Sequence, residues 1–395
     1  MREPLHRFAD IHYGKSPTEV LTMDSEIPIF GTGGRYGSAT RPLFNGPAVI
    51  VARKGSLGNP HLALTPFWAS DTTYAVVPKS EVDVRWLYYS LSLFDLTKLN
   101  EATGVPSINR DWLRRIELES ATPDQQRQIA EILGTVDEVI EQTKALIAKQ
   151  QQVKAGLMHD LFTRGVTATG TLRPPAAEAP HLYQDSPLGP IPREWIVREL
   201  AEFYANPIRD FGSFASTNLI TFTETGIPFI KSEMIGVEEI IWDSVMYITH
   251  QVHQALSKSH VNEGIILFSK IGSALGKAVI YDGSRGACNS NAAVAKIDIA
   301  PKIGSAEFVM HYLNHDFARS QFRQIIVSLL PRINLGDISR LLIPSPLVEE
   351  QRQIADLINS ASDKIRAEAA HLAKLRQEKQ GLMQDLLTGR VPVPA

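Results

Sequence analysis

Two long stretches of the chain repeat apolar residues at intervals of three and four, the period of one face of an α-helix. After Pro123, the apolar positions of the first stretch are Ile129, Leu133, Val136, Ile140, Ile147, Val153 and Leu157. Those of the second stretch are Ile354, Ile358, Ala361, Ile365, Leu372, Leu375, Leu382 and Leu386. Gly165 and Gly389 follow near the C-terminal ends, where a left-handed cap is favourable. The pattern predicts two helices of about 40 residues, each about 60 Å long at 1.5 Å per residue.

A stripe this long and narrow stays in water unless another surface covers it. Two related stripes in one chain can cover each other as a coiled coil. The alternative is that each helix packs on its own globular domain. The length and narrowness of both stripes favour the paired arrangement.

Three short motifs recur at one constant separation. QRQIA at Gln126 returns 225 residues later at Gln351, and PSIN at Pro106 returns at the same separation as PRIN at Pro331. GLMHDLFT at residues 156–163 returns as GLMQDLLT at 381–388. The chain is therefore predicted to be a tandem repeat of a unit about 200 residues long.

Residues 1–122 and 193–345 are predicted to be two globular domains of mixed α/β (α+β) class with many short strands. In both, an apolar run (47–53 and 264–270) precedes a Gly–Ser turn, a second strand (72–78 and 292–298), a helical pattern and the Pro-x-Ile-Asn motif. The long helices are assigned to 123–165 and 346–391, and the proline-rich segment 166–192 is predicted to be a linker. Residues outside this skeleton differ strongly, so the prediction is one scaffold that carries two different surfaces.

The charged residues are unevenly distributed along the chain. The net charge of −3 does not by itself indicate a nucleic-acid-binding protein. However, residues 27–70 and 317–336 contain no Asp or Glu, and 264–297 contain only Asp282. The basic residues of these stretches suit a face that contacts phosphates. Chance clustering on a solvated surface is the alternative.

Cysteine content and hydropathy limit the class of protein further. The single cysteine, Cys288, excludes a disulfide framework and a cysteine-rich zinc site. No apolar run approaches the roughly 20 residues needed to span a bilayer, and the first residues do not form a secretion signal. A cytoplasmic protein is therefore expected.

Several motifs, in their order along the chain, resemble those of the specificity subunits of Type I restriction–modification systems. They are GKSPTE (14–19), IPIFGTGGRYG (27–37), KGSLGN (54–59), SPLGPIPREW (186–195), IPFIKSEMI (227–235), KIGSALGK (270–277), CNSNAA (288–293) and EEQRQIA (349–355). No single string is specific, but their order and their doubling at constant offset are. The resemblance covers nearly the full length of the chain.

The resemblance implies two target-recognition domains separated by two long helices that pair as an antiparallel coiled coil. Each domain would read one half of a bipartite, asymmetric site in double-stranded DNA. Two adenine methylase subunits would dock on the long helices, two restriction motor–nuclease subunits would join for cleavage, and no membrane would be involved. No cofactor is expected in this chain, because S-adenosylmethionine, ATP and Mg belong to the partner subunits.

Base readout needs hydrogen-bonding side chains on loops at groove edges, and glycines let the backbone approach DNA closely. In the first domain the candidate DNA-binding residues are Gly31, Thr32, Gly34, Arg35, Tyr36, Arg53, Lys54, Ser56 and Asn59. In the second they are Lys231, Ser232, Lys270, Ser273, Lys277, Asn289, Ser290, Asn291 and Arg332. Ordinary tight turns are the alternative for the glycine-rich loops. Asn109 and Asn334 recur at equal positions and are interpreted as scaffold or phosphate contacts.

The chain lacks the motifs that catalysis would need. There is no Asn/Asp-Pro-Pro-aromatic motif of adenine methylases, and GSALGKA (272–278) misses the first glycine and the Ser/Thr of a phosphate-binding loop. His311 and His315 could suit a metal, but without an acidic or cysteine partner a surface or DNA-facing pair is favoured. A non-catalytic DNA-specificity subunit is the preferred hypothesis. The alternatives are a nuclease or methylase acting alone and a coiled-coil assembly scaffold without direct base readout.

Overall fold

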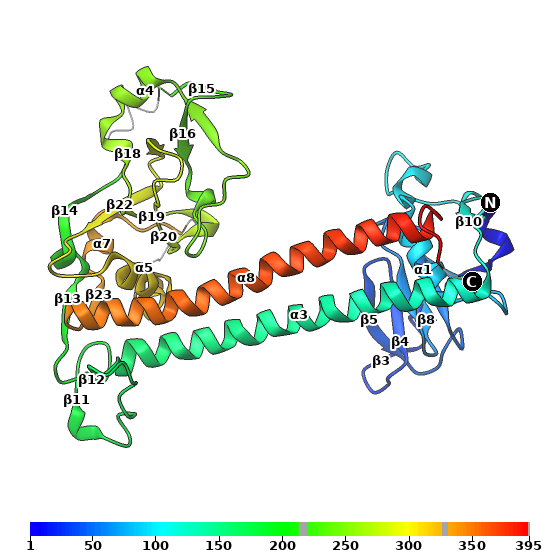
Figure 1. The fold of residues 1–395 in the computed structure, drawn as a ribbon, viewed down its shortest axis with the longest axis horizontal. Helices are drawn as coiled ribbons and strands as arrows, with labels where there is room; N and C mark the ends of the chain where they lie inside the picture. The colour runs from blue at the N-terminus through cyan, green and yellow to red at the C-terminus, as the bar shows by residue number, and fades with distance from the viewer. Residues whose placement is uncertain (213–217, 219, 326–330, 394–395) are drawn as a thin grey trace. The chain divides into compact units, whose positions relative to one another are not determined.

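A computed structural model describes residues 1–212, 218, 220–325 and 331–393 of the chain. It divides into two compact units, Met1–Ile147 with Ala367–Ala395, and Ala148–Arg366. Each unit holds one globular domain and a part of each of two long helices (Figure 1). The mixed class, with two globular domains and two long helices, is confirmed.

Both predicted long helices are present. They are α3 (Pro123–Arg164, 42 residues) and α8 (Val348–Leu387, 40 residues). In the first unit, Ile129 and Leu133 of α3 share one core with Leu386 of α8. In the second unit, Leu161 of α3 shares a core with Ile358 of α8. The start of one helix therefore meets the end of the other in each unit, as an antiparallel pair requires (Figure 1).

The two helices carry the same seam of buried and half-buried residues, with alternating spacings of three and four. In α3 its members are Gln126, Ile129, Leu133, Val136, Ile140, Thr143, Ile147, Gln150, Lys154, Leu157 and Leu161. In α8 they are Gln351, Ile354, Ile358, Ala361, Ile365, Glu368, Leu372, Leu375, Lys379, Leu382 and Leu386. Each member of the second set lies 225 residues after its counterpart, and the period of 3.5 residues is that of a coiled coil.

One predicted seam residue is wrong. Val153 is 62% exposed, and the neighbouring Lys154 occupies the seam position instead. The alternation of three and four places Lys154 on the buried face and Val153 one position off it. Because Val153 is apolar, the sequence pattern assigned it to the seam in place of Lys154.

The first domain consists of two four-stranded sheets, in the orders β2-β9-β6-β7 and β3-β5-β4-β8, and a small β1-β10 pair. Its elements are β1 (Arg2–Pro4), β2 (Ala9–Tyr13), β3 (Leu21–Thr22), β4 (Pro28–Gly31), β5 (Gly34–Ala39), β6 (Ala48–Ala52), β7 (His61–Ala63), β8 (Trp68–Ala69), β9 (Thr73–Pro78), α1 (Val84–Leu93), α2 (Arg110–Arg114) and β10 (Glu117–Glu119). The central strand β6 is buried along its whole length, as its apolar sequence predicts. Helix α1 contributes Trp86 and Leu87 to the core shared with the long helices.

The second domain repeats this plan with sheets in the orders β14-β22-β19-β20 and β15-β17-β16-β21-β18. Its elements are β13 (Ile196–Glu199), β14 (Tyr204–Arg209), β15 (Phe222–Thr223), β16 (Ile227–Ile230), β17 (Met246–Ile248), α4 (His250–Ala255), β18 (His260–Val261), β19 (Ile266–Ser269), β20 (Ala278–Ile280), β21 (Cys288–Ser290), β22 (Val294–Ile299), α5 (Ala306–Asn314), α6 (Asp316–Ile325), α7 (Leu335–Ser339) and β23 (Leu342–Ser345). The only parallel pairs among the described strands, β4 with β8 and β16 with β21, occupy equivalent places in the two domains. The internal repeat therefore extends from the sequence motifs to the strand order.

The predicted linker contains regular structure. Within it, β11 (Tyr183–Gln184) pairs antiparallel with β12 (Ile191–Pro192). Arg173 forms an ion pair with Glu350 of α8, which also accepts a hydrogen bond of 3.1 Å from the Trp195 indole N–H. Gly165 ends α3 with φ of +61°, and a Cβ there would lie 2.3 Å from the Trp195 ring. Only glycine fits this turn, which confirms the predicted left-handed cap.

The buried first glutamine of each QRQIA motif joins a long helix to its domain. The Oε1 atom of Gln126 accepts from the backbone N–H of Asp83, the N-cap of α1, at 2.9 Å. The Oε1 atom of Gln351 accepts from the N–H of Ser305, the N-cap of α5, at 3.0 Å. Each side-chain amide also donates to the carbonyl five residues earlier, Ala121 or Pro346. The same contact therefore fixes the angle between helix and domain in both units.

Replacing Gln351 by Ala is expected to lower the free energy of unfolding by about 1–3 kcal/mol, because it leaves buried backbone groups without partners. Gln126→Ala should have an effect of similar size. Gln377→Ala, an exposed position on α8, should change it by less than about 0.5 kcal/mol. Urea denaturation followed by circular dichroism measures all three. Equal effects at Gln351 and Gln377 would show that the buried amide does not hold the helix.

Candidate nucleic-acid interface

The two predicted DNA-facing groups of the first domain lie next to each other. The β4–β5 hairpin carries Gly31 to Tyr36, and the loop after β6 carries Arg53 to Asn59. The His61 ring nitrogen Nε2 is 3.3 Å from the carbonyl oxygen of Thr32 in the hairpin turn. A Cβ added to Gly55 would lie 3.7 Å from the Thr32 hydroxyl. Arg35, Tyr36, Lys54, Ser56 and Asn59 are exposed on this continuous surface.

Two glycines of the hairpin are needed for its shape. Gly34 has a φ of +100°, and a Cβ there would approach the His61 ring to 3.3 Å. A Cβ on Gly31 would lie 2.9 Å from the Tyr36 ring. These glycines therefore form the tight turn and let the Tyr36 ring lie across the strand. The turn leaves the Arg35 and Tyr36 side chains in solvent.

Arg53 is held more firmly than its neighbours. Its guanidinium lies 5.1 Å from the centre of the Tyr13 ring, and that of Arg110 lies 5.0 Å from the same ring. Arg53 Nη1 also donates to the carbonyl of Asp71 at 3.3 Å. Arg53 is half-buried, so it supports the base of the loop and exposes only part of its side chain.

The Pro-x-Ile-Asn motif anchors the Gly–Ser loop in the same way in both domains. In the first, the N–H of Ile108 donates to the carbonyl of Arg53 and that of Gly55 to the carbonyl of Pro106, both at 2.9 Å. In the second, the N–H of Ile333 donates to the carbonyl of Lys270 at 3.0 Å, and that of Gly272 to the carbonyl of Pro331 at 3.4 Å. Arg53 and Lys270 are therefore equivalent positions.

Asn109 and Asn334 complete this anchor. Each is an N-cap, and its side-chain oxygen accepts a hydrogen bond from the N–H of Asp111 in α2 or Asp337 in α7. Of the two roles proposed from the sequence, the structure therefore shows the scaffold role.

In the second domain, the predicted residues divide into an accessible and a buried set. Ser273 and Arg332 are exposed, and Lys231, Ser232, Lys277 and Asn291 are half-exposed. The Ile271–Arg332 bridge joins the loop after β19 to the anchoring motif. Residues 326–330 of the third acid-free stretch lie outside the described residues.

Lys270, Asn289 and Ser290 are buried, contrary to what a DNA-facing role requires. Lys270 Nζ donates to the Asp210 carboxylate at 2.5 Å, and Ser290 Oγ accepts from Lys296 at 3.0 Å. Asn289 bonds to the His253 ring and to the carbonyl of Leu256. Asn289 and Ser290 lie on β21, an interior strand of its sheet, so their polar groups are used within the domain. Direct base contact by these three side chains has no support in this geometry.

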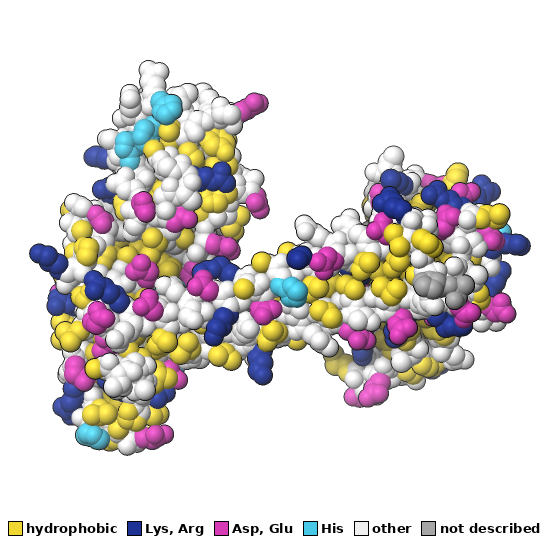
Figure 2. Space-filling model, in the orientation of Figure 1, with side chains coloured by type: hydrophobic (Ala, Val, Ile, Leu, Met, Phe, Trp, Pro, Cys, Tyr) yellow, Lys and Arg dark blue, Asp and Glu magenta, His cyan; other side chains and the backbone are white. Residues whose placement is uncertain are grey.

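The charges of the visible face are mixed. Lys and Arg stand among Asp and Glu over both units in Figure 2, in keeping with the small net charge. Attraction to phosphates would therefore come from local groups such as the acid-free loops.

Comparison with known proteins decides the family. A family model described as the Type I restriction modification DNA specificity domain matches residues 5–151 and 192–377. The chain belongs to this family. It is 24% identical to the Type I restriction enzyme MjaVIII specificity subunit of Methanocaldococcus jannaschii, over 95% of this chain and 81% of that protein. It is 22% identical to the EcoDI specificity subunit of Escherichia coli, over 86% of this chain and 76% of that protein.

Solved structures show the same fold. The S subunit of a Type I restriction–modification system from M. genitalium aligns with a TM-score of 0.62 at 16% identity, covering 100% of this chain and 96% of that one. A chain from a structure on complex assembly and conformational transition of the Type I system aligns at 0.55 and 15% identity, covering 99% and 98%. Each Type I specificity domain of this chain thus has the fold of its family.

The surface or DNA-facing pair expected for His311 and His315 is wrong for His311. His315 caps the end of α5 in an extended conformation, so the two histidines are not on one continuous helix. His311 is fully buried rather than facing solvent or DNA, because it hydrogen-bonds Glu238 and Asn359. Within the described ranges, no group of three or more His, Cys, Asp or Glu is arranged to hold a metal. None of the helices described combines the length and apolar character needed to cross a bilayer.

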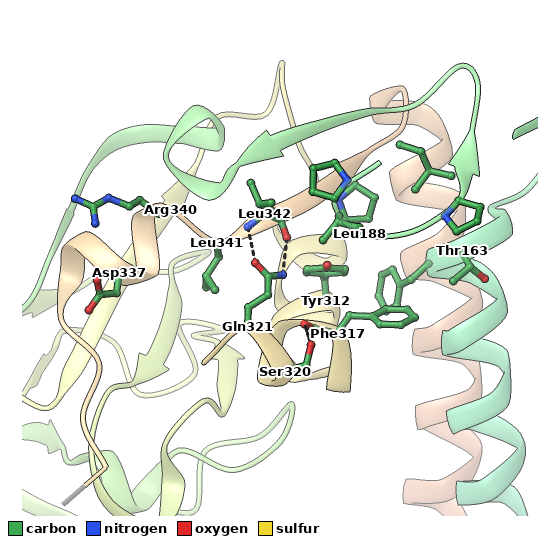
Figure 3. Close-up of a pocket in the computed structure, with 15 residues that line it drawn as sticks. Thr163, Leu188, Tyr312, Phe317, Ser320, Gln321, Asp337, Arg340, Leu341 and Leu342 are labelled. Carbon is green, nitrogen blue, oxygen red and sulfur yellow. Dashed lines mark hydrogen bonds between the residues drawn. The ribbon is translucent and has the colours of Figure 1, made fainter. Parts of the chain in front are cut away.

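A hollow in the second unit was not predicted from the sequence. It is lined by the end of α3, the linker, α5, α6 and β23, with Tyr312 and Phe317 near Thr163 (Figure 3). Gln321 forms part of the wall and exchanges two hydrogen bonds with the backbone of Leu342. In the first unit, a second hollow is lined by Thr388, Leu387 and Arg115, which are the repeat counterparts of Thr163, Phe162 and Arg340.

Sequence reasoning also missed Lys296, which lies within the predicted strand of the second domain. It is 1% exposed and donates to the Asp210 carbonyl at 2.9 Å. Burial, reinforced by the charges of Arg209 and Lys270 and opposed by Asp210, lowers the pKa of Lys296 to about 7. A lysine inside an apolar strand was the available signal.

Lys296→Met is expected to raise the melting temperature more at pH 6.5 than at pH 9.5. The unfolded chain protonates this lysine up to about pH 10.4, whereas the folded chain does so only below about 7. The cost of burying the charge is therefore full below pH 7 and fades as the pH rises. Differential scanning calorimetry measures the shift, with the exposed Lys302→Met as control. A gain in melting temperature that is the same at both pH values would contradict a lowered pKa of Lys296.

Proposed function

We propose that the chain is the sequence-specific DNA-binding subunit of a Type I restriction–modification complex. It recognises a bipartite, asymmetric site and directs adenine-N6 methylase and motor–nuclease subunits to it. The observation that carries this proposal is one scaffold present twice, with the same loop anchor and different loops. Equal scaffolds present their loops in equivalent ways, and unequal loops read different sequences.

The loops at equivalent places differ in chemistry and shape. The first domain presents the glycine hairpin with Arg35 and Tyr36. At the corresponding strand end, the second domain presents Lys231 and Ser232 at the start of a 3-10 turn, η6 (Ser232–Met234). Arg, Lys and Ser at groove edges provide hydrogen-bond donors, and Tyr adds a planar apolar surface. The accessible residues described above form the two proposed reading surfaces.

Docking of partner subunits is supported by features outside the loops. Ile132, Val139 and Leu146 are exposed on α3 at intervals of seven, which suits an apolar helix of a partner. The corresponding α8 positions are Leu357, Lys364 and His371. The two equivalent hollows suit two copies of one subunit, as expected for two methylases. Restriction subunits would join this assembly for cleavage.

The chain itself is proposed to be non-catalytic, with S-adenosylmethionine, ATP and Mg bound by the partner subunits. The purified chain is expected to transfer no methyl group from labelled S-adenosylmethionine to DNA and to hydrolyse no ATP. Addition of the cognate methylase subunit should start methyl transfer and serves as the positive control. Methyl transfer by the chain alone would assign it to the methylase class instead.

Arg35→Ala and Lys277→Ala are expected to weaken DNA binding by the methylase-loaded complex about 5- to 100-fold, as loss of one base or phosphate contact does. Fluorescence anisotropy at about 0.1 M salt measures the affinity. Lys302→Ala is the matched control, because Lys302 follows β22 at the end opposite the reading loops. Probes with one scrambled half-site assign each effect to one domain.

Unchanged affinity for both variants would favour the alternative function, a coiled-coil scaffold without direct base readout. Equal loss of affinity for every DNA sequence at both half-sites would point to phosphate contacts alone.

A further inference from the structure

The seam lysine that recurs in the two long helices has a different acidic partner in each unit. Lys379 on α8 and Lys154 on α3 are equivalent by the 225-residue repeat. Lys379 also lies over the ring of Tyr89 on α1, whereas Lys154 shares its acidic partner with His311 on α5. The two sites differ in which part of the chain supplies the acidic residue.

In the first unit, the lysine, its acidic partner and the neighbouring tyrosine all lie on helices. Lys379 Nζ is 2.6 Å from Asp137 of α3, and its distance to the Tyr89 ring centre is 5.2 Å. The Tyr89 hydroxyl donates to the other Asp137 oxygen at 2.8 Å. The recognition loops of the first domain take no part in this group.

In the second unit, the acid comes from a loop of the recognition domain. Ser362 occupies the position equivalent to Asp137 and cannot supply a charge. Glu238 replaces it, with its Oε1 atom 2.6 Å from Lys154 Nζ and 3.1 Å from His311 Nδ1. The other ring nitrogen of His311 is 2.7 Å from Asn359 Oδ1 on α8. Glu238 is thus connected to both long helices.

The Glu238 backbone is held in an unfavourable conformation. Its φ of 65° makes it the one non-glycine residue with positive φ among those the structure describes. Asn or Gly suits this region far better than Glu, so the long carboxylate side chain is what the position requires. The N–H of Glu238 donates to the carbonyl of Ala278 at 3.3 Å. The N–H of Gly236 closes the turn by donating to the carbonyl of Glu239.

The negative charge of Glu238 is strongly stabilised. Burial alone would raise the pKa of Glu238, but hydrogen bonds and charges from His311 and Lys154 outweigh it and hold the pKa at about 2. The side chains of Lys154, Glu238 and His311 are 16%, 9% and 0% exposed. Losing one partner would leave a buried charge uncompensated.

The turn that carries Glu238 is continuous with the proposed reading loops. The N–H of Ile241 donates to the carbonyl of Met234 at 2.8 Å. This bond closes the turn onto η6, beside Lys231 and Ser232. Ala278, which accepts from Glu238, directly follows Lys277. The Asn314 side chain of α5 bonds to both backbone groups of Ala278.

We propose that Glu238 is a positioning residue that fixes the reading loops of the second domain to both long helices, whereas the described residues of the first domain contain no such link. This inference rests on the proposed function for its effect on DNA. Lys154 and His311 act through Glu238. Half-site recognition by the second domain therefore depends on the helix seam, and that by the first domain depends on its own core.

The test uses the full chain with Glu238→Gln, which keeps the shape and removes the charge, and Lys154→Met as an independent second variant. Hydrogen–deuterium exchange of residues 231–241 and 277–279 in the isolated chain should accelerate at least about tenfold. Lys154→Arg, which keeps the positive charge, should leave exchange as slow as in the unchanged chain. Asp137→Asn and Lys379→Met are the matched controls, and they should leave exchange of residues 31–36 and 53–59 unchanged.

The second arm maps N6-methyladenine in DNA from cells that express each complex. Glu238→Gln and Lys154→Met should relax the sequence of the half-site read by the second domain about fivefold or more, with the other half-site unchanged. Unaltered exchange, or accelerated exchange with both half-sites intact, would overturn the proposal. A wild-type complex that methylates no bipartite site would overturn the proposed function instead, and the exchange arm would still decide whether the link exists.

Discussion

A helix of about 40 residues with a narrow apolar stripe is stable in water only when that stripe is covered, because tertiary packing supplies most of a helix's stability. Here α3 and α8 carry their stripes in the same heptad register, 225 residues apart. In each unit the beginning of one helix and the end of the other complete the core of a globular domain. The buried glutamines at 126 and 351 then fix each domain against its helix with the same set of hydrogen bonds. Duplication of one unit thus produces two domains held in equivalent ways.

On this repeated frame, structural and variable positions separate clearly. The Pro-x-Ile-Asn motif holds the Gly–Ser loop with the same two backbone bonds in both domains. The side chains around that anchor differ: Arg53 packs on Tyr13, whereas its counterpart Lys270 pairs with Asp210. A fixed anchor allows the loop sequence to change without loss of the fold, which is what a protein that reads different DNA sequences needs. The charged link through Glu238 in the second domain adds a difference that the shared scaffold does not require.

Periodicity and repetition in the sequence predicted the helices, the duplicated plan and the strands around 48–52 and 266–269, because burial imposes those patterns directly. The prediction failed where neighbours distant in sequence decide burial. Val153 is apolar but lies off the seam, while Asn289, Ser290 and Lys270 are polar yet buried among partners that no local pattern reveals. His311 and His315 had helical spacing, but the chain leaves the helix at His315. The exposed hairpin residues Arg35 and Tyr36 were predictable, because glycine spacing defines a tight turn locally.

The proposed function implies that the long helices set the spacing between the two DNA half-sites. Deleting one heptad from each helix, residues 140–146 and 365–371, removes equivalent positions and keeps the seam in register. Each helix shortens by about 10 Å, which corresponds to about three base pairs at 3.4 Å per pair. Mapping of N6-methyladenine in cells that express the shortened complex should show both half-site sequences retained and their spacing changed by about that amount. Methylation at the original spacing would contradict the account.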